Sequence, residues 1–400
     1  MVIKQHLSGI GKSACVVALS ISSSALFASN FDQTNLVSSV PGLAANTDPN
    51  LIDPWGVAFS PTSPFWLANQ NSATTTLYDG AGNLIEIGGN PAIAIPGGAS
   101  GTAGPTGEVF NSTTGFQLNG APAHFIFANL NGTISGWTGG ASALLASSAT
   151  TPGATFTGLA LASNGGSNYL YAADSTYLTG KIDVFNSSFQ PLTLGSGSFP
   201  GNFTDPNGLA GYVPFNVQLI GGQLYVAYAN LNPDGSSNPG GYVDIYNTNG
   251  TFVKRLASGG ALNAPWGFAV APATFGSFGG DLLIANNGNG WINAFNPTTG
   301  AFIGTMDGPN GQPLVYQDLW SIDFRTGGTN VNTNALYFVE GINNDTGGLF
   351  GELTVATPEP ASLLVSSFGV LGLGLVAWRR KNGLKHAAIG RPCRLSRTNR

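Results

Sequence analysis

Residues 264–308 read APWGFAVAPATFGSFGGDLLIANNGNGWINAFNPTTGAFIGTMDG, and this stretch decides the fold. Four short apolar or aromatic runs lie at 266–270, 281–285, 291–295 and 301–306. Each run is closed by turn residues such as Asn-Gly pairs, which is typical of antiparallel β-strands. One four-stranded sheet cannot bury both of its faces, so a chain that repeats this unit must stack the copies.

The same unit recurs along the chain, and we count six copies, at residues 55–87, 107–143, 158–194, 216–256, 266–306 and 320–355. The sixth copy has only three strands, while residues 34–40 form a strand without a neighbour in sequence. Pairing that first strand with the last sheet removes two unpaired edges at once. The pattern therefore predicts an all-β, six-bladed β-propeller over residues 30–355. The second copy is the least regular, so a count one higher or lower stays open.

The outer strands are less sharply marked than the inner ones. We expect the fourth strand of the first copy at 84–87, followed by a long Gly- and Pro-rich loop at 88–104. The fourth strand of the second copy is weak and lies near Ala143, and that of the third copy is expected at 191–194.

Charge is distributed unevenly. Residues 30–357 hold four basic side chains and eighteen carboxylates, a net charge of −14, whereas basic residues gather at both ends of the chain. Such an acidic body argues against nucleic-acid binding and suits hard cations. His124 is the only histidine in this part, which excludes a three-histidine zinc site and His-based triads within it, and we expect it to be a packed or capping residue.

The two ends of the chain have the composition of targeting segments. Residues 1–29 have a basic start, an apolar stretch and small residues, which is typical of a secretory signal peptide, the alternative being a buried N-terminal helix. Residues 356–382 contain Pro358, Glu359 and Pro360, then a single hydrophobic helix and a basic cluster. Residues 383–400 form a basic C-terminal extension.

Three motifs carry a resemblance to known families: DPWGVAFSPTSPFWLANQNS at 53–72, PTGEVFN at 105–111 and GTISGW at 132–137. The repeats resemble NHL-type propellers and the related lactonase and regucalcin-like group. More specifically, the chain resembles an uncharacterised bacterial family of secreted propellers. The tail resembles a PEP-CTERM signal, which implies cleavage near Pro-Glu-Pro by an exosortase-type transpeptidase in a Gram-negative envelope. An ordinary single-pass membrane anchor is the alternative.

One set of polar residues follows the second strand of each copy, and a propeller places such positions around one face. The set consists of Asn69, Asn129, Asp174, Asn230, Asn286 and Glu340. Beside them we expect three tryptophans that begin inner strands: Trp55, Trp266 and Trp320. We predict that these nine residues bind a ligand, with Asp174 and Glu340 as ligands of calcium. The alternative is that Asn and Asp only form the turns.

The predicted function is that of an exported cell-surface or extracellular-matrix binding module, without catalytic residues, whose partners are the sorting machinery and a polysaccharide or matrix component. The membrane is involved through the C-terminal helix before processing. The alternative is a calcium-dependent lactonase or hydrolase with its site at the mouth of the axial channel. A tryptophan at several of the inner-strand positions argues against this enzyme, because the regucalcin-like group is expected to place an acidic ligand there.

Overall fold

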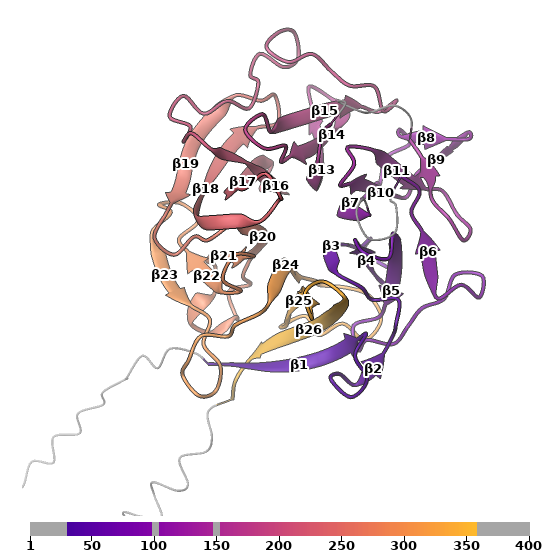
Figure 1. Cartoon of the computed structure of the whole chain (residues 1–400), viewed down its shortest axis with the longest axis vertical. Coiled ribbons are helices and arrows are strands. Elements are labelled where there is room, and N and C mark those ends of the chain that lie inside the picture. Colours follow the sequence, from indigo (N-terminus) through magenta and orange to yellow (C-terminus); the bar gives the residue numbers. More distant parts are fainter. Residues whose placement is uncertain (1–29, 98–103, 147–152, 358–400) are drawn as a thin grey trace, which may run out of the picture. The chain divides into compact units, whose positions relative to one another are not determined.

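The structure is a computed structural model that describes residues 30–97, 104–146 and 153–357. Within these residues six β-sheets stand in a ring, so the predicted six-bladed β-propeller is confirmed (Figure 1). The helical content of the described residues is one 3-10 turn, η1 (Gly276–Phe278). No helix in this part of the chain is long and apolar enough to cross a membrane.

Each blade takes its strands in chain order. The first blade consists of β3 (Pro54–Ala58), β4 (Phe65–Asn69), β5 (Thr74–Tyr78) and β6 (Ala92–Ala94). The second consists of β7 (Pro105–Phe110), β10 (Phe125–Asn129), β11 (Ile134–Trp137) and β12 (Leu144–Leu145). The third consists of β13 (Phe156–Asn164), β14 (Ser167–Asp174) and β15 (Lys181–Asn186). The fourth blade consists of β16 (Tyr212–Ile220), β17 (Gln223–Leu231), β18 (Ser237–Asn247) and β19 (Phe252–Ser258). The fifth consists of β20 (Pro265–Val270), β21 (Leu282–Asn286), β22 (Ile292–Phe295) and β23 (Phe302–Thr305). A small hairpin, β8 (Gln117–Leu118) and β9 (Ala121–Pro122), lies within the second blade's first connection.

The sixth blade closes the ring. It contains β24 (Asp318–Phe324), β25 (Leu336–Ile342) and β26 (Gly347–Val355), then β1 (Phe31–Ser38) and the short parallel strand β2 (Asn46–Thr47). Figure 1 shows the indigo β1 beside the yellow β26. The Phe31 ring also packs on the fifth blade, 5.0 Å from the Phe275 ring centroid. The predicted closure by the N-terminal strand is therefore confirmed, and this strand joins two blades.

The innermost strands β3, β7, β13, β16, β20 and β24 contact one another around the axis. Their backbones approach so closely that several positions require glycine. A Cβ on Gly56 would lie 2.4 Å from the Thr106 carbonyl oxygen, and one on Gly107 would lie 2.3 Å from the Leu159 nitrogen. Because real Cβ atoms do not come this close to backbone atoms, the Gly in these repeats fixes the narrow inner ring.

Two predicted outer strands are wrong. In the first blade the fourth strand is β6, inside the expected loop, whereas Leu84 and Ile87 form only isolated bridges. In the third blade the described residues form three strands, and Pro191 makes a single bridge to Phe185. Outer strands bury little surface, so their pattern is weakly constrained by packing. The weak fourth strand near Ala143 is confirmed as β12.

The predicted signal peptide, the sorting motif at Pro358 to Pro360, the hydrophobic helix and the basic extension lie outside the described residues. They remain predictions from the sequence.

Candidate functional site

A cavity of about 780 Å³ opens on the face where the second strands end and the inner strands begin. Trp55, Phe215 and Trp320, from three inner strands, form its apolar wall. Its polar lining comes from the turns between strands and from the start of β24, and includes Asn232, Asp234, Ser236, Asn287, Gln317, Asp318 and Asp345. No Lys or Arg lines it. We call this space the mouth cavity; it lies on the face that the sequence predicted.

The three predicted tryptophans form one cluster. Trp55 and Trp320 stack with ring centroids 3.5 Å apart, and Trp266 meets Trp320 edge-on at 5.7 Å. The Trp266 Nε1 donates a hydrogen bond of 3.0 Å to the Thr157 carbonyl oxygen. Trp55 and Trp320 line the mouth cavity. Trp266 lines a second space between the innermost strands, which we call the axial channel. The cluster therefore lies between the two spaces, and Trp55, which is half-buried, offers indole surface to a ligand.

The six predicted turn residues do not line the mouth cavity; residues next to several of them do, such as Ser175 and Asn287. Asn69, Asn129 and Asn286 are fully buried, and their Nδ2 groups donate to neighbouring strand and loop oxygens. The structure thus gives these amides local roles, as turn chemistry allows.

The other three have local partners as well. Asp174 accepts hydrogen bonds from the Thr155 and Thr176 nitrogens, and Asn230 accepts one of 3.4 Å from Asn238. Glu340 accepts from the Gln317 nitrogen at 3.0 Å. Burial raises the Glu340 pKa to about 7, against the effect of that hydrogen bond.

Asp174 and Glu340 belong to different blades, the third and the sixth. In residues 30–97, 104–146 and 153–357, no three His, Cys, Asp or Glu side chains are grouped so that they could hold a metal ion. Calcium binding by Asp174 and Glu340 stays a prediction.

Three carboxylates that are far apart in the sequence converge at the mouth cavity. Asp318 and Asp345 line it, and Asp53 lies buried behind them. The Oδ1 atoms of Asp53 and Asp345 each lie 2.8 Å from the point that a Gly341 Cβ would occupy, and the Asp318 Cβ lies 3.3 Å from it. Both Oδ1 atoms are buried without a hydrogen-bond partner, whereas the Asp53 Oδ2 accepts a hydrogen bond of 3.4 Å from Asn71. We call these three residues the acidic cluster.

The charges of the acidic cluster repel one another. Burial, followed by the Asp345 charge, raises the pKa of Asp53 well above its ordinary value. The indole N–H groups of Trp55 and Trp320 oppose this shift, although neither completes a hydrogen bond. Burial and then Asp345 also raise the pKa of Asp318 to about 6. A carboxylate of raised pKa in a cavity wall, as at Asp318, is typical of a functional site.

The loop that carries Asp345 has an unusual backbone. Asn343, Asn344 and Asp345 all have positive φ, at 56°, 53° and 61°, and Asp53 has a φ of 50°. Asn and Asp tolerate this left-handed conformation better than other side chains, yet three in a row are costly. Sequence reasoning did not select Asp345; the Asn-Asn-Asp run before Thr346 was the available signal.

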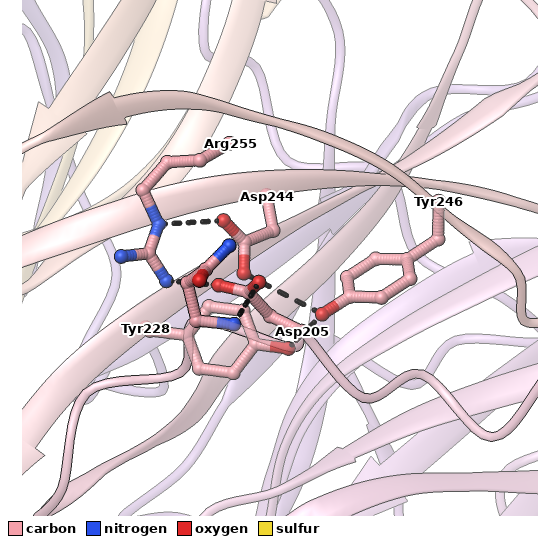
Figure 2. A network of polar contacts seen from close by, with 6 residues as sticks. Asp205, Tyr228, Asp244, Tyr246 and Arg255 are labelled. Carbon is pink, nitrogen blue, oxygen red and sulfur yellow. Dashed lines mark hydrogen bonds and ion pairs between the residues drawn. The ribbon is translucent and has the colours of Figure 1, made fainter.

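A second charged network lies in the fourth blade, and there an arginine pairs with the carboxylates (Figure 2). Arg255 donates through Nε to Asp244 at 3.0 Å and through Nη2 to Asp205, and its guanidinium lies 3.8 Å from the Tyr242 ring centroid. Tyr246 donates to Asp244 at 3.4 Å. Burial raises the Asp244 pKa to about 6 despite Arg255. Because one cation satisfies both carboxylates, we read this network as structural: it holds the loop before β16 against the blade.

The axial channel is smaller, at about 260 Å³, and two carboxyl side chains, Glu108 and Asp323, line it. Burial raises the pKa of both Glu108 and Asp323 well above their ordinary values. Both Glu108 carboxyl oxygens are buried without a hydrogen-bond partner. In the blades on either side, the residue after the inner-strand glycine is apolar, as at Val57 and Leu159. His124 is exposed, and its ring lies 6.2 Å from the Trp137 ring at an angle of 57°, so the expected buried packing of this histidine is wrong.

These observations define the class: the protein is a six-bladed β-propeller with an acidic, tryptophan-walled cavity at one mouth. Two proteins of Acanthamoeba polyphaga mimivirus are similar to it in sequence. Uncharacterized protein R648 is 33% identical over 337 residues, covering 80% of this chain and 78% of that protein. Uncharacterized protein L690 is 31% identical over 337 residues, covering 80% and 84%. The chain belongs to the family of these uncharacterized mimivirus proteins.

These relatives are viral, whereas the sequence resemblance indicated a bacterial family, so a bacterial source stays a prediction. No protein-family model matches the chain. Among solved structures, a streptogramin B lyase aligns with a TM-score of 0.46 and 12% identity, covering 84% of this chain and all of that one. A soluble aldose sugar dehydrogenase from Escherichia coli aligns with a TM-score of 0.48 and 12% identity, covering 82% and 100%. At these values the likeness carries no argument about activity.

Proposed function

We propose that this protein is an exported binding module that holds a hydroxyl-rich ligand, a saccharide, in the mouth cavity. The observation that carries the proposal is the stacked pair Trp55 and Trp320 in the wall of a cavity whose rim presents amide, hydroxyl and carboxylate groups. A sugar has apolar C–H faces that pack on an aromatic ring and hydroxyl groups that need hydrogen-bond partners around its rim.

The size and position of the cavity support the same ligand class. Its volume of about 780 Å³ lies within the range of small-ligand sites. The Asn232, Ser236 and Asn287 side chains are half-buried or exposed around it, so they can exchange hydrogen bonds with water for bonds to a ligand.

The test is a titration of the full chain with soluble neutral glycans, followed by tryptophan fluorescence and calorimetry. We expect Trp55→Ala to weaken binding at least tenfold. The matched control is Trp291→Ala, which removes another half-buried indole, in the fifth blade, that does not line the cavity. Equal binding by both variants, or no binding of any glycan by the wild type, would contradict the proposal.

The proposal that the protein is exported rests on the sequences of its N-terminal and C-terminal segments. The N-terminal signal, the Pro358-Glu359-Pro360 motif and the following basic cluster support secretion and exosortase processing, with the mature protein at the cell surface or in the matrix. Intact-mass measurement of the protein from its native host tests this step. A mass that includes residues 383–400 would leave a simple membrane anchor instead.

A further inference from the structure

We propose that the mouth cavity binds a linear oligosaccharide along its length, with one sugar ring on Trp55 and another on Tyr177, so that affinity depends on the number of linked sugars. The inference deepens the proposed function and rests on it. It names the ligand as an extended glycan chain rather than a single terminal sugar.

The first argument is that the mouth cavity has a second aromatic surface. Tyr177 lines the cavity and is 43% exposed. Within residues 30–97, 104–146 and 153–357, neither the ring nor the hydroxyl group of Tyr177 has a ring contact or a hydrogen-bond partner. The protein therefore gives this side chain no packing role in the part of the chain described. A ligand in the cavity can contact both the face of the ring and the hydroxyl group.

The second argument is the separation of the two aromatic surfaces around the ring. Trp55 begins the inner strand of the first blade, and it stacks on Trp320 of the sixth. Tyr177 lies between β14 and β15, in the third blade. The innermost strands contact one another in chain order and close from β24 to β3, so the third and sixth blades stand opposite each other. A ligand that touches both surfaces must therefore extend across the cavity.

The third argument is that hydrogen bonds hold the turn that carries Tyr177. The Asp174 Oδ1 accepts from the Thr176 nitrogen at 3.0 Å and from the Thr176 hydroxyl at 2.5 Å. The Gly180 nitrogen donates a bond of 2.8 Å to the Thr176 carbonyl, which closes the turn around Tyr177. A Cβ on Gly180 would lie 2.4 Å from the Asp174 carbonyl oxygen, so only glycine lets the turn close against β14. Because the turn is formed before binding, ordering it costs the ligand little affinity.

Polar groups line the cavity between the two aromatic surfaces. The fourth and fifth blades lie between the third and the sixth, and they contribute Asn232, Asp234, Ser236 and Asn287 to the cavity wall. All four side chains are half-buried or exposed. A glycan chain presents hydroxyl groups along its edges, and these can both donate to and accept from such side chains. Two aromatic surfaces with polar groups between them thus suit a chain of sugar rings.

The experiment measures the binding of linear β-1,4-linked glucose oligomers, from one to six residues long, to the full chain by calorimetry. We expect the dissociation constant to fall by about tenfold at one step of this series, where the oligomer first reaches from Trp55 to Tyr177. One oligomer should bind per chain. Tyr177→Ala should remove the step and leave the affinity for shorter oligomers within about twofold. Tyr177→Phe should retain the step, because it keeps the ring.

The matched control is Leu178→Ala. Leu178 belongs to the same turn and is 62% exposed, but it does not line the cavity, so this variant should leave every affinity unchanged. Both Tyr177 and Leu178 are exposed, so their substitution should leave the fold intact, and equal melting temperatures check this.

Each other outcome counts against the inference. Affinity that does not depend on length, while Trp55→Ala still weakens binding, would overturn it and leave the proposed function standing. A step that survives in Tyr177→Ala, or that is also lost in Leu178→Ala, would overturn the placement at Tyr177. Two oligomers per chain would mean that the aromatic surfaces bind separate ligands. If no oligomer binds, the inference fails, and the proposed function is then decided by the other neutral glycans.

Discussion

Replacing Asp318 by Asn should stabilise the protein at neutral pH. Burial and the Asp345 charge raise the Asp318 pKa from 3.8 to about 6, so the folded state holds this proton more tightly than the unfolded state does. The favourable contribution is fully present below about pH 4 and is lost as the pH rises through about 6. Asn has no charge to lose. The melting temperature of the variant, relative to the wild type, should therefore increase with pH and level off above about pH 7.

The structure sets the size of this effect. A pKa raised by about two pH units corresponds to about 3 kcal/mol at 1.36 kcal/mol per unit. Asp318 is half-buried and lines an open cavity, so water screens part of the repulsion, and we expect about 1–2 kcal/mol. For a domain of some 300 residues, 1 kcal/mol corresponds to about 1.5 °C, so the variant should melt about 2–3 °C higher at pH 8.

The assay is differential scanning calorimetry of wild type, Asp318→Asn and Glu86→Gln at pH 4 to 8. Glu86 is exposed, so its variant controls for the loss of one charge from an acidic protein. A melting temperature of Asp318→Asn that stays below the wild type at every pH would refute the reasoning, because Asp318 would then stabilise the fold. A rise of the same size in Glu86→Gln would show that net charge is responsible.

Three further substitutions test separate parts of the fold by urea unfolding. Phe31→Ala should cost about 3–5 kcal/mol, because the buried ring anchors the closing strand to the fifth blade; a loss below 1 kcal/mol would contradict that anchoring. Glu108→Leu should gain about 1–3 kcal/mol, because a buried carboxyl whose oxygens complete no hydrogen bond is replaced by an apolar side chain; destabilisation would mean that the neighbouring Thr75 hydroxyl outweighs the cost of burial. Arg255→Ala should cost about 3 kcal/mol, because Asp205 and Asp244 lose their cation; unchanged stability would show that water satisfies them.

The repeating part of the fold was predictable because its signals are local. Apolar runs closed by Asn-Gly and similar turns define the inner strands, and the unpaired first strand predicted the closure. The outer strands failed for the opposite reason. Leu84 and Ile85 are exposed, so their apolar character did not mark a strand, whereas Ala92–Ala94 pairs with β5 without a distinctive sequence.

The candidate site was predicted only in part. Trp55 and Trp320 line the mouth cavity, and their binding of a ligand stays a prediction. The polar turn residues were selected by position, but a side chain such as Asp174 has backbone N–H groups within reach, and it bonds to them instead of facing the cavity. No local pattern distinguishes a turn residue that satisfies its own loop from one that faces a ligand.

The grouping of the three residues in the acidic cluster was not predicted, because ring closure creates it. Asp53 follows the closing strands β1 and β2, while Asp318 and Asp345 belong to the sixth blade, so nearly the whole propeller separates them in sequence. They meet because β1 pairs with β26 and because the Asp53 nitrogen then reaches the Gly347 carbonyl. The seam that removes the open sheet edges is thus also the place where like charges are brought together. Because the pairing that stabilises the seam opposes the repulsion within it, removing one charge of the cluster, as in Asp318→Asn, should also stabilise the closed ring.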